Sequence, residues 1–285
     1  MHDGLALVHA VRQASWAAST YGTTAVRVAL RGHRLSLGGH EERIVFVVGS
    51  PRSGTTFVGG ALGSQPGFVD LGEVPPLKAA VARLAPLPDE EQALGVRRIL
   101  ERLRRLALVR RLRGVEQTPE MSYLLPGALV AYPAGTAVHV LRDGRDVVCS
   151  LLERGWLNAS RAGSDDANQP YGAHPRFWVE PERREEFGRV SDARRAAWAW
   201  RRYVTAARAV PERTVELRYE ALVADPAAAA DRVTGALGAE PGPLRTAFSA
   251  AHHSSVGRWR RDLSVEQLAD VEAEAGELLA ELGYL

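Results

Sequence analysis

The residues best placed to do chemistry lie in the segment GSPRSGTT, which runs from Gly49 to Thr56. Its two glycines have the G-x-x-x-x-G spacing of a phosphate-binding loop, in which backbone N–H groups and a helix N-terminus surround an anion. Thr55 stands where a nucleotide triphosphatase keeps the lysine that reaches the β- and γ-phosphates. Arg52 restores a cation whose planar fork can bridge two anionic groups. The loop therefore predicts a phosphate site with a charge geometry different from that of an ATPase.

A second pair of residues that could bind phosphate is Arg142 and Ser150, in the segment LRDGRDVVCS. An arginine at a strand end and a hydroxyl one or two helical turns later can converge on one phosphate. By itself the pair fits a surface Asp–Arg cluster and a buried helical serine equally well, but the first loop favours the phosphate interpretation. Asp143 and Asp146 flank Arg145, and we expect them to pair with it rather than with a metal.

Such residues need strands that end beside them. Apolar, β-branched runs predict strands at 43–50, 136–143 and 214–222, and helical patterns at 145–155 and 191–210 alternate with them. This order predicts an α/β protein of the P-loop type, in which helices flank a central parallel sheet as three layers. Ligands of such sheets bind at the carboxyl ends of the strands.

The run from Pro51 to Thr56, PRSGTT, resembles the 5′-phosphosulfate loop of the sulfotransferases that use 3′-phosphoadenosine 5′-phosphosulfate (PAPS). The resemblance implies that PAPS is the sulfuryl donor, that 3′-phosphoadenosine 5′-phosphate (PAP) is the product, and that no metal is required. It also implies that Arg142 and Ser150 bind the 3′-phosphate. The 5′-phosphosulfate would lie against Arg52, Ser53, Gly54, Thr55 and Thr56.

Glu73 is the candidate general base. It stands 21 residues after Arg52, which resembles the protein-tyrosine and glycan branches of the family, and a carboxylate that takes the acceptor's proton contributes roughly 10²–10⁴ in rate. The cytosolic branch uses a histidine, so His139 and His174 are the alternatives. Without a catalytic role, Glu73 would be a carboxylate at a helix start.

Tyr219, in LRYEALVADP, resembles the tyrosine that reaches the adenine, and Phe57 resembles an aromatic that stacks on adenine in the cytosolic branch. Both also fit core aromatics. In EQTPEMSY, Gln117 stands where bacterial members have the lysine of a Lys-Thr-Pro stretch.

The segment HHSSVGRWRRDLS at 252–264 resembles the family's glycine–tryptophan segment that closes over the nucleotide. Its histidines and serine at 252–254 replace the Arg-Lys-Gly triplet of the cytosolic branch. Ser255, Gly257 and Arg258 are therefore the expected replacements in the 3′-phosphate clamp.

The resemblance covers residues 44–285, which we expect to form one domain, with 156–190 as a variable loop or lid and 1–43 as an N-terminal helical extension. The chain has 285 residues, a net charge of +2 and 46% hydrophobic residues, which favours a globular protein without nucleic acid as a partner. No apolar run approaches the roughly 20 residues that span a bilayer, and the first residues lack a basic segment before an apolar core, so we expect a cytoplasmic protein. The single cysteine, Cys149, excludes an internal disulfide and a multi-cysteine metal site, and we expect it to be a packed, inert thiol.

The acceptor is not specified: a hydroxyl or amine of a small molecule, lipid or glycan would serve. A basic helix predicted at 96–113 is a solvated face, or a surface for an acidic substrate, a partner or an anionic membrane. A homo-oligomer also stays open. Two other functions compete with sulfuryl transfer, namely a P-loop kinase or ATPase, and a PAPS- or PAP-binding protein without catalysis.

Overall fold

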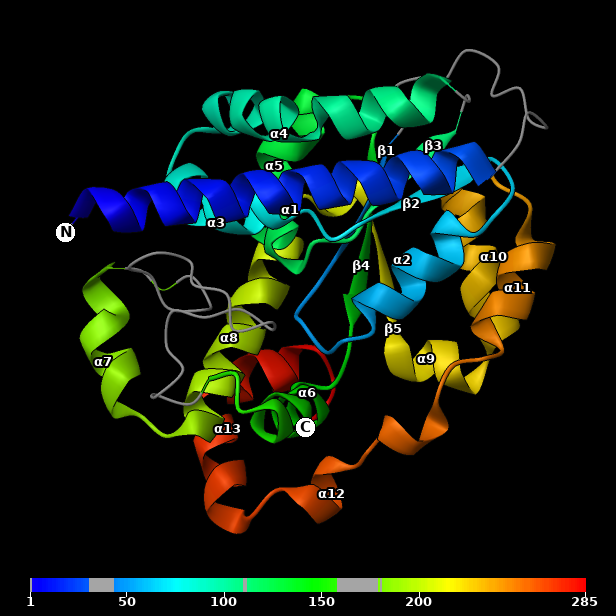
Figure 1. The fold of residues 1–285 in the computed structure, drawn as a ribbon. Coiled ribbons are helices and arrows are strands. Elements are labelled where there is room, and N and C mark those ends of the chain that lie inside the picture. Colours follow the sequence, from blue (N-terminus) through cyan, green and yellow to red (C-terminus); the bar gives the residue numbers. More distant parts are fainter. Residues whose placement is uncertain (1, 31–43, 110–111, 158–178, 180) are drawn as a thin grey trace.

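The computed structural model describes residues 2–30, 44–109, 112–157, 179 and 181–285. Its centre is a parallel five-stranded sheet with the strand order β2-β3-β1-β4-β5 (Figure 1). The strands are β1 (Ile44–Val48), β2 (Phe68–Gly72), β3 (Arg113–Glu116), β4 (Thr136–Leu141) and β5 (Thr214–Arg218). The predicted α/β fold with a parallel sheet between helical layers is confirmed.

The alternation of side chains along β1 shows why the protein has three layers. Ile44, Phe46 and Val48 belong to one buried cluster, and Val45 and Val47 belong to another on the opposite face. The first face carries α1 (His2–Leu30), α3 (Pro75–Leu84), α4 (Asp89–Val109), α5 (Leu125–Ala131), α6 (Gly144–Arg154), α8 (Asp192–Ala207) and α13 (Val265–Glu281). The other face carries α2 (Thr55–Gly63), α9 (Tyr219–Ala224), α10 (Pro226–Leu237) and α11 (Pro241–Phe248).

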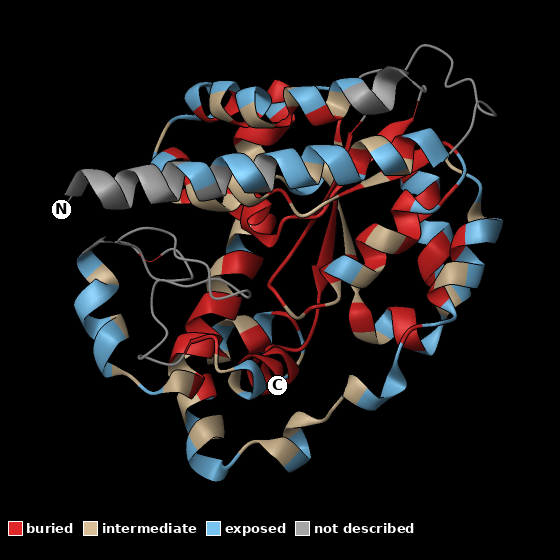
Figure 2. Cartoon of the chain, viewed as in Figure 1, coloured by how far each residue is buried: buried red, intermediate tan, exposed pale blue. Residues whose placement is uncertain are grey.

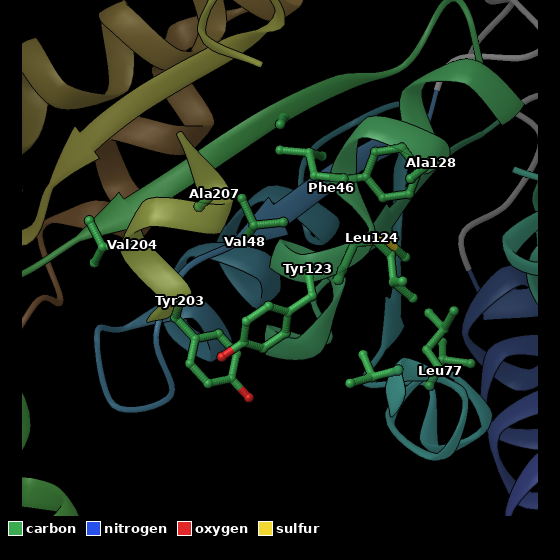
Figure 3. Packing of buried hydrophobic residues seen from close by; sticks show 14 of the residues in the cluster. Phe46, Val48, Leu77, Tyr123, Leu124, Ala128, Tyr203, Val204 and Ala207 are labelled. Atoms are coloured by element: carbon green, nitrogen blue, oxygen red, sulfur yellow. The ribbon is translucent and has the colours of Figure 1, made fainter. Parts of the chain in front are cut away.

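Aromatic residues fill the core beneath the first loop. The ring centroids of Tyr123 and Tyr203 lie 4.7 Å apart, and those of Phe46 and Tyr132 lie 6.1 Å apart. Figure 3 shows Tyr123 and Tyr203 side by side, with Phe46 above them in this view. Tyr123 lies in a short 3₁₀ segment, η1 (Pro119–Leu124). The core therefore fixes the segment that follows β3.

Helix α1 packs against β2, α3 and α4. Its last turns are anchored by Arg27, whose Nη1 lies 2.8 Å from Asp70 Oδ2 and donates to the Asp70 carbonyl at 3.0 Å. Two residues of α1 itself, Thr24 and Val28, are buried, whereas much of the outer side of the helix is exposed (Figure 2). The extension is thus attached at the edge strand of the sheet.

Two predicted elements differ in extent, and two strands were not predicted. The strand predicted at 214–222 ends at Arg218, and Tyr219 begins α9. The helix predicted at 96–113 is α4, which starts at Asp89 and ends at Val109, and Arg113 lies in β3 instead. Strands β2 and β3 were not predicted, because each is short and carries a charged residue that breaks an apolar pattern.

The segment 156–190, predicted to be irregular, is helical where the structure describes its end. Residues Pro181–Arg183 form a 3₁₀ turn, η3, and Arg184–Arg189 form α7, none of whose residues is buried. Most of the predicted lid, and with it His174, lies outside the described residues.

Candidate active site

The loop between β1 and α2 has an unusual backbone. Gly49 and Gly54 have φ angles of 141° and 99°, and Arg52 is the one described non-glycine residue with a positive φ, 73°. A Cβ at position 49 would lie 2.5 Å from the Val140 carbonyl oxygen, and one at position 54 would lie 2.8 Å from the Tyr219 ring. Both glycines are therefore required by the close approach of β4 and of Tyr219. A strained arginine in such a turn suggests a functional position.

Helix α2 presents its N-terminus to the same loop. Its N-cap is Gly54, which supplies no side-chain cap, and Val58 donates the first intrahelical bond to the Gly54 carbonyl at 3.0 Å. The N–H groups of Thr55, Thr56 and Phe57 precede that bond, and helix N-termini attract anions. Ser53 is fully buried in the turn, and its N–H donates to the Ser50 carbonyl at 3.1 Å.

The two predicted phosphate sites lie in direct contact. Arg52 Nε donates to Ser150 Oγ at 2.9 Å, and Arg142 Nη1 donates to the Arg52 carbonyl at 3.1 Å. Arg142 also donates to the Ser255 carbonyl and lies 5.2 Å from the centroid of the Tyr219 ring. The structure thus brings together residues from the first loop, from the turn between β4 and α6, from α9 and from the C-terminal segment.

Positive charge gathers at Arg52. Its pKa is lowered, first by burial and then by the nearby cations of Arg154, Arg142 and Arg258, with Glu153 acting in the opposite direction. Among the described residues, no carboxylate forms an ion pair with Arg52. Cations that repel one another in this way favour the binding of an anion between them.

Asp146 holds the C-terminal segment onto this surface. Its Oδ2 accepts a hydrogen bond from the Gly257 N–H at 2.7 Å, and its Oδ1 accepts one from the Trp259 N–H at 3.0 Å. Burial is the main cause that raises the pKa of Asp146. The expected pairing of both aspartates with Arg145 is wrong for Asp146, since only Asp143 pairs with Arg145, at 2.8 Å.

Arg258 is already paired with carboxylates. It binds Glu153 and Asp262, the latter at 2.7 Å, and its pKa is raised chiefly by the hydrogen bond with Glu153. Ser255 lies in a 3₁₀ turn, η5 (His253–Ser255), and its hydroxyl donates to the His252 carbonyl at 3.3 Å. Arg258 would have to share its donors in order to contact a phosphate.

Glu73 lies directly after β2, at the carboxyl end of the sheet. Its Oε2 is 2.7 Å from Lys78 Nζ, one turn into α3. The next residue, Val74, donates its N–H to Thr118 Oγ1 at 2.7 Å, and the Gly49 N–H donates to Ser122 Oγ at 3.0 Å. The segment between Thr118 and Ser122 thereby ties the backbone beside Glu73 to the start of the loop.

His139 lies elsewhere. It is fully buried in the middle of β4, its Nδ1 is 3.5 Å from Glu216 Oε2, and burial lowers its pKa. It lines a pocket with Thr205 and Arg208 that reaches Thr214, the first residue of β5. The pocket thus opens toward the amino end of β5, although His139 itself is in register with Val48, the last residue of β1. Of the candidate bases that the structure describes, Glu73 is the one that follows the carboxyl end of a strand.

No family model and no curated protein matches the sequence. Among solved structures, the sulfotransferase domain from the curacin biosynthetic pathway matches with a TM-score of 0.53 and 15% identity, and the match covers 82% of this chain and 96% of that domain. The chain has the sulfotransferase fold. The sulfotransferase domain of the olefin synthase from Synechococcus PCC 7002 covers 82% of this chain and 94% of its own length, at 15% identity and a TM-score of 0.48. A sulfotransferase from Mycobacterium avium has 16% identity, coverages of 84% and 76%, and a TM-score of 0.47.

Within this sulfotransferase fold, the lysine position of the Lys-Thr-Pro stretch has a packing role. Gln117 is buried against Gly59 of α2, and its Nε2 is 3.3 Å from Asp70 Oδ1. A lysine ammonium does lie at this edge of the sheet, but it comes from α3, where Lys78 pairs with Glu73. The sequence signal for Lys78 was a lysine one turn into the helix that follows the strand end, and our prediction missed it.

A buried carboxyl also lies at this edge of the sulfotransferase fold. Glu116, the last residue of β3, is fully buried, and its Oε1 accepts the Thr118 N–H at 2.8 Å while Oε2 has no hydrogen-bond partner. Burial is the first cause that raises its pKa to about 8, and the charges of Glu73 and Glu120 add to the shift. No sequence pattern distinguished this residue from a surface glutamate.

The remaining predicted residues have structural contacts. Phe57 packs against Phe248 with 6.0 Å between ring centroids, and the hydroxyl of Tyr219 donates to the His252 carbonyl at 3.3 Å. Burial raises the pKa of Cys149 to about 12, so its thiol stays protonated. In the described part of the chain, no cluster of three or more His, Cys, Asp or Glu side chains is arranged to hold a metal. No helix in that part combines the length and apolarity needed to cross a bilayer.

Proposed function

We propose that this protein is a sulfotransferase that uses PAPS as its donor and releases PAP. The observation that carries the proposal is the contact of Arg52 with both Ser150 and Arg142, which joins two strand-end loops into one cationic surface. A ligand with anionic groups at two ends, such as PAPS, matches a surface of that kind. The shared fold adds support from the architecture.

The residues divide into three groups along such a ligand. Arg52 and the N–H groups from Gly54 to Thr56 would hold the 5′-phosphosulfate, since fixed donors at a helix N-terminus suit an oxyanion. The Ser53 N–H is already bonded to the Ser50 carbonyl. Arg142 and Ser150 would hold the 3′-phosphate, beneath a cover made of Ser255, Gly257 and Arg258. Tyr219 and Phe57 would border the adenine.

Bound PAPS would supply an activated sulfuryl group. Glu73 would accept the proton of an acceptor hydroxyl or amine, and Lys78 would orient the carboxylate through its 2.7 Å ion pair. Arg52 and the loop N–H groups would stabilise the charge that develops on the leaving phosphate, where one fixed donor contributes roughly 2.7–4 kcal/mol. This scheme needs no metal, because the arginines and amides supply the positive charge.

The rival function is ATP chemistry, which would require Mg²⁺ and a γ-phosphate. Isothermal titration calorimetry with PAP, 5′-AMP and ATP, each with and without EDTA, separates the two. We expect PAP to bind most tightly, because the binding depends on the 3′-phosphate. EDTA should leave the affinity for PAP unchanged, because arginines and amides rather than a metal supply the positive charge. Tightest binding of ATP, lost on chelation, would refute the proposal.

A further inference from the structure

A pocket of about 610 Å³ lies between α1, α3 and α4. Figure 1 shows α1 running across α3, with α4 alongside, and the three helices are in contact. Ligand pockets have volumes of roughly 300–1,000 Å³, so this one is large enough for a small molecule. Nothing in the phosphate-binding surface described above uses it.

The pocket begins beside the proposed base. Val74, which directly follows Glu73, forms part of its wall together with Pro76 in the first turn of α3. The N–H of Val74 is fixed by Thr118 at 2.7 Å. Glu73 is not itself among the lining residues, so a molecule that reached Glu73 from this pocket would pass Val74 and Pro76 and extend along α3.

The walls are largely apolar and leave space. On α1, Ala14, Ala18 and Tyr21 line the pocket at spacings of four and three residues, which places them on one helix face. Ile99 and Leu103 line it from α4. Ala14 and Ala18 are exposed although they lie on the side of α1 that lines the pocket. Their short side chains do not fill the space between α1, α3 and α4. Arg102 is the one charged side chain among the lining residues.

We infer that this pocket receives the apolar body of the sulfuryl acceptor, and that the acceptor is an alcohol with an aliphatic chain. The inference rests on the proposed function and narrows its acceptor. A sugar would bring several hydroxyls against mostly apolar walls, on which only Thr20, Tyr21 and Arg102 of the described lining residues offer polar groups, at a cost in desolvation. In the reaction, the acceptor oxygen bonds to sulfur and its proton passes to Glu73. The bond from sulfur to the bridging oxygen breaks, and PAP leaves with that electron pair.

A chain-length series tests this. Transfer from PAPS to 1-butanol, 1-hexanol, 1-octanol and 1-decanol should show kcat/KM rising by about fourfold per methylene, the factor that corresponds to ~0.8 kcal/mol at 25 °C, until the pocket is full. Ala18→Trp should flatten that rise by filling the pocket. Ser19→Trp, the neighbouring exposed position that does not line the pocket, should retain it.

A second variant covers the case in which Ala18→Trp does not fold. Ile99→Ala enlarges the pocket and should move the preferred alcohol to a longer chain. Rates that do not depend on chain length, or identical profiles for Ala18→Trp and Ser19→Trp, would overturn the inference.

Binding without turnover separates this inference from the proposed function. Titration of the PAP complex with 1-octanol should give heat in the wild type and in Ser19→Trp, and none in Ala18→Trp. If N-acetylglucosamine is sulfated and the alcohols neither bind nor react, the function stands and the inference is wrong. If PAP shows no preference over 5′-AMP while 1-octanol still binds only with Ala18 present, the sulfotransferase proposal fails and the apolar pocket stands.

Discussion

The guanidinium Nε of Arg52 donates a 2.9 Å hydrogen bond to the hydroxyl of Ser150, although the two residues are 98 positions apart in the sequence. This bond joins the strained turn after β1 to helix α6. The two segments, each of which resembled a separate phosphate site, form one surface. A change in Arg52 should therefore affect both ends of a bound nucleotide.

Replacing Arg52 with alanine should lower kcat for sulfuryl transfer from PAPS by at least about 10², because one fixed donor at developing charge is removed. Arg52→Lys keeps a charge but lacks the planar fork with which Arg52 can bind Ser150 and a ligand at the same time. Its kcat should therefore lie between those of the wild type and Arg52→Ala. Steady-state kinetics on the folded variants measure this. Near-normal turnover by Arg52→Ala would exclude the role.

Glu73→Gln should lower turnover by roughly 10²–10⁴, the contribution of a general base. The affinity for PAP should stay within about twofold, because Glu73 lies after β2 and outside the phosphate-binding contacts. Calorimetry and kinetics on the same sample distinguish an enzyme from a protein that only binds the nucleotide. If wild type and variant show the same turnover, Glu73 is not the base.

Gly54→Ala should abolish detectable PAP binding, since a Cβ at this φ of 99° would lie 2.8 Å from the Tyr219 ring. Gly60→Ala is the matched control in the same helix, where a Cβ meets nothing within 4 Å. The control should gain about 0.5–1 kcal/mol of stability, because alanine is the better helix former. Equal PAP affinity in the two variants, measured by calorimetry, would contradict this reading of the loop.

Asp146→Asn should weaken PAP binding by about tenfold, as expected if the segment from Gly257 to Trp259 closes over the nucleotide. The substitution removes the charge from two backbone hydrogen bonds, and bonds to charged groups contribute roughly 1.5–3 kcal/mol. Asp231→Asn serves as control, because it breaks an ion pair with Arg245 that is exposed and therefore screened by solvent. Hydrogen exchange of the segment should rise only in Asp146→Asn. Unchanged exchange there would show that Asp146 does not hold it.

Glu116 should make stability depend on pH. Its pKa rises from 4.5 to about 8 on folding, so between these values the folded state keeps a proton that the unfolded state releases. Its contribution to stability is therefore complete below pH 4.5 and decreases as pH rises toward 8, by at most about 1.4 kcal/mol per pH unit. Glu116→Gln removes this titration, so its free energy of unfolding should fall less between about pH 5 and 8. Urea denaturation at several pH values measures this free energy for both proteins. If it changes with pH by the same amount in wild type and Glu116→Gln, the assignment is wrong.

A central parallel sheet could be predicted because β1 and β4 carry nearly continuous apolar runs that are buried on both faces. Strand β3, with the sequence RGVE, could not, because its arginine and glutamate are buried through partners that the sequence does not reveal. Arg113 lies 5.2 Å from the centroid of the Phe68 ring and donates to the Leu237 carbonyl. These partners come from β2 and α10, far along the chain.

The sequence by itself determined the glycine-containing turn from strand to helix at residues 49–55, because glycine spacing and a strand-to-helix change are local properties of the chain. It also determined that Arg142 and Ser150 follow a strand end and so reach the carboxyl edge of a parallel sheet, whereas the strand before Glu73 was not predicted. Only the tertiary structure decided how these residues pair: Ser150 with Arg52, Lys78 with Glu73, and Asp146 with the backbone of the C-terminal segment. It also decided that α1 completes a largely apolar pocket whose wall includes Val74, the residue after Glu73. Pairings of this kind depend on the packing of distant elements, because hydrogen bonds and cavities are set by angstrom-scale positions that no local pattern encodes.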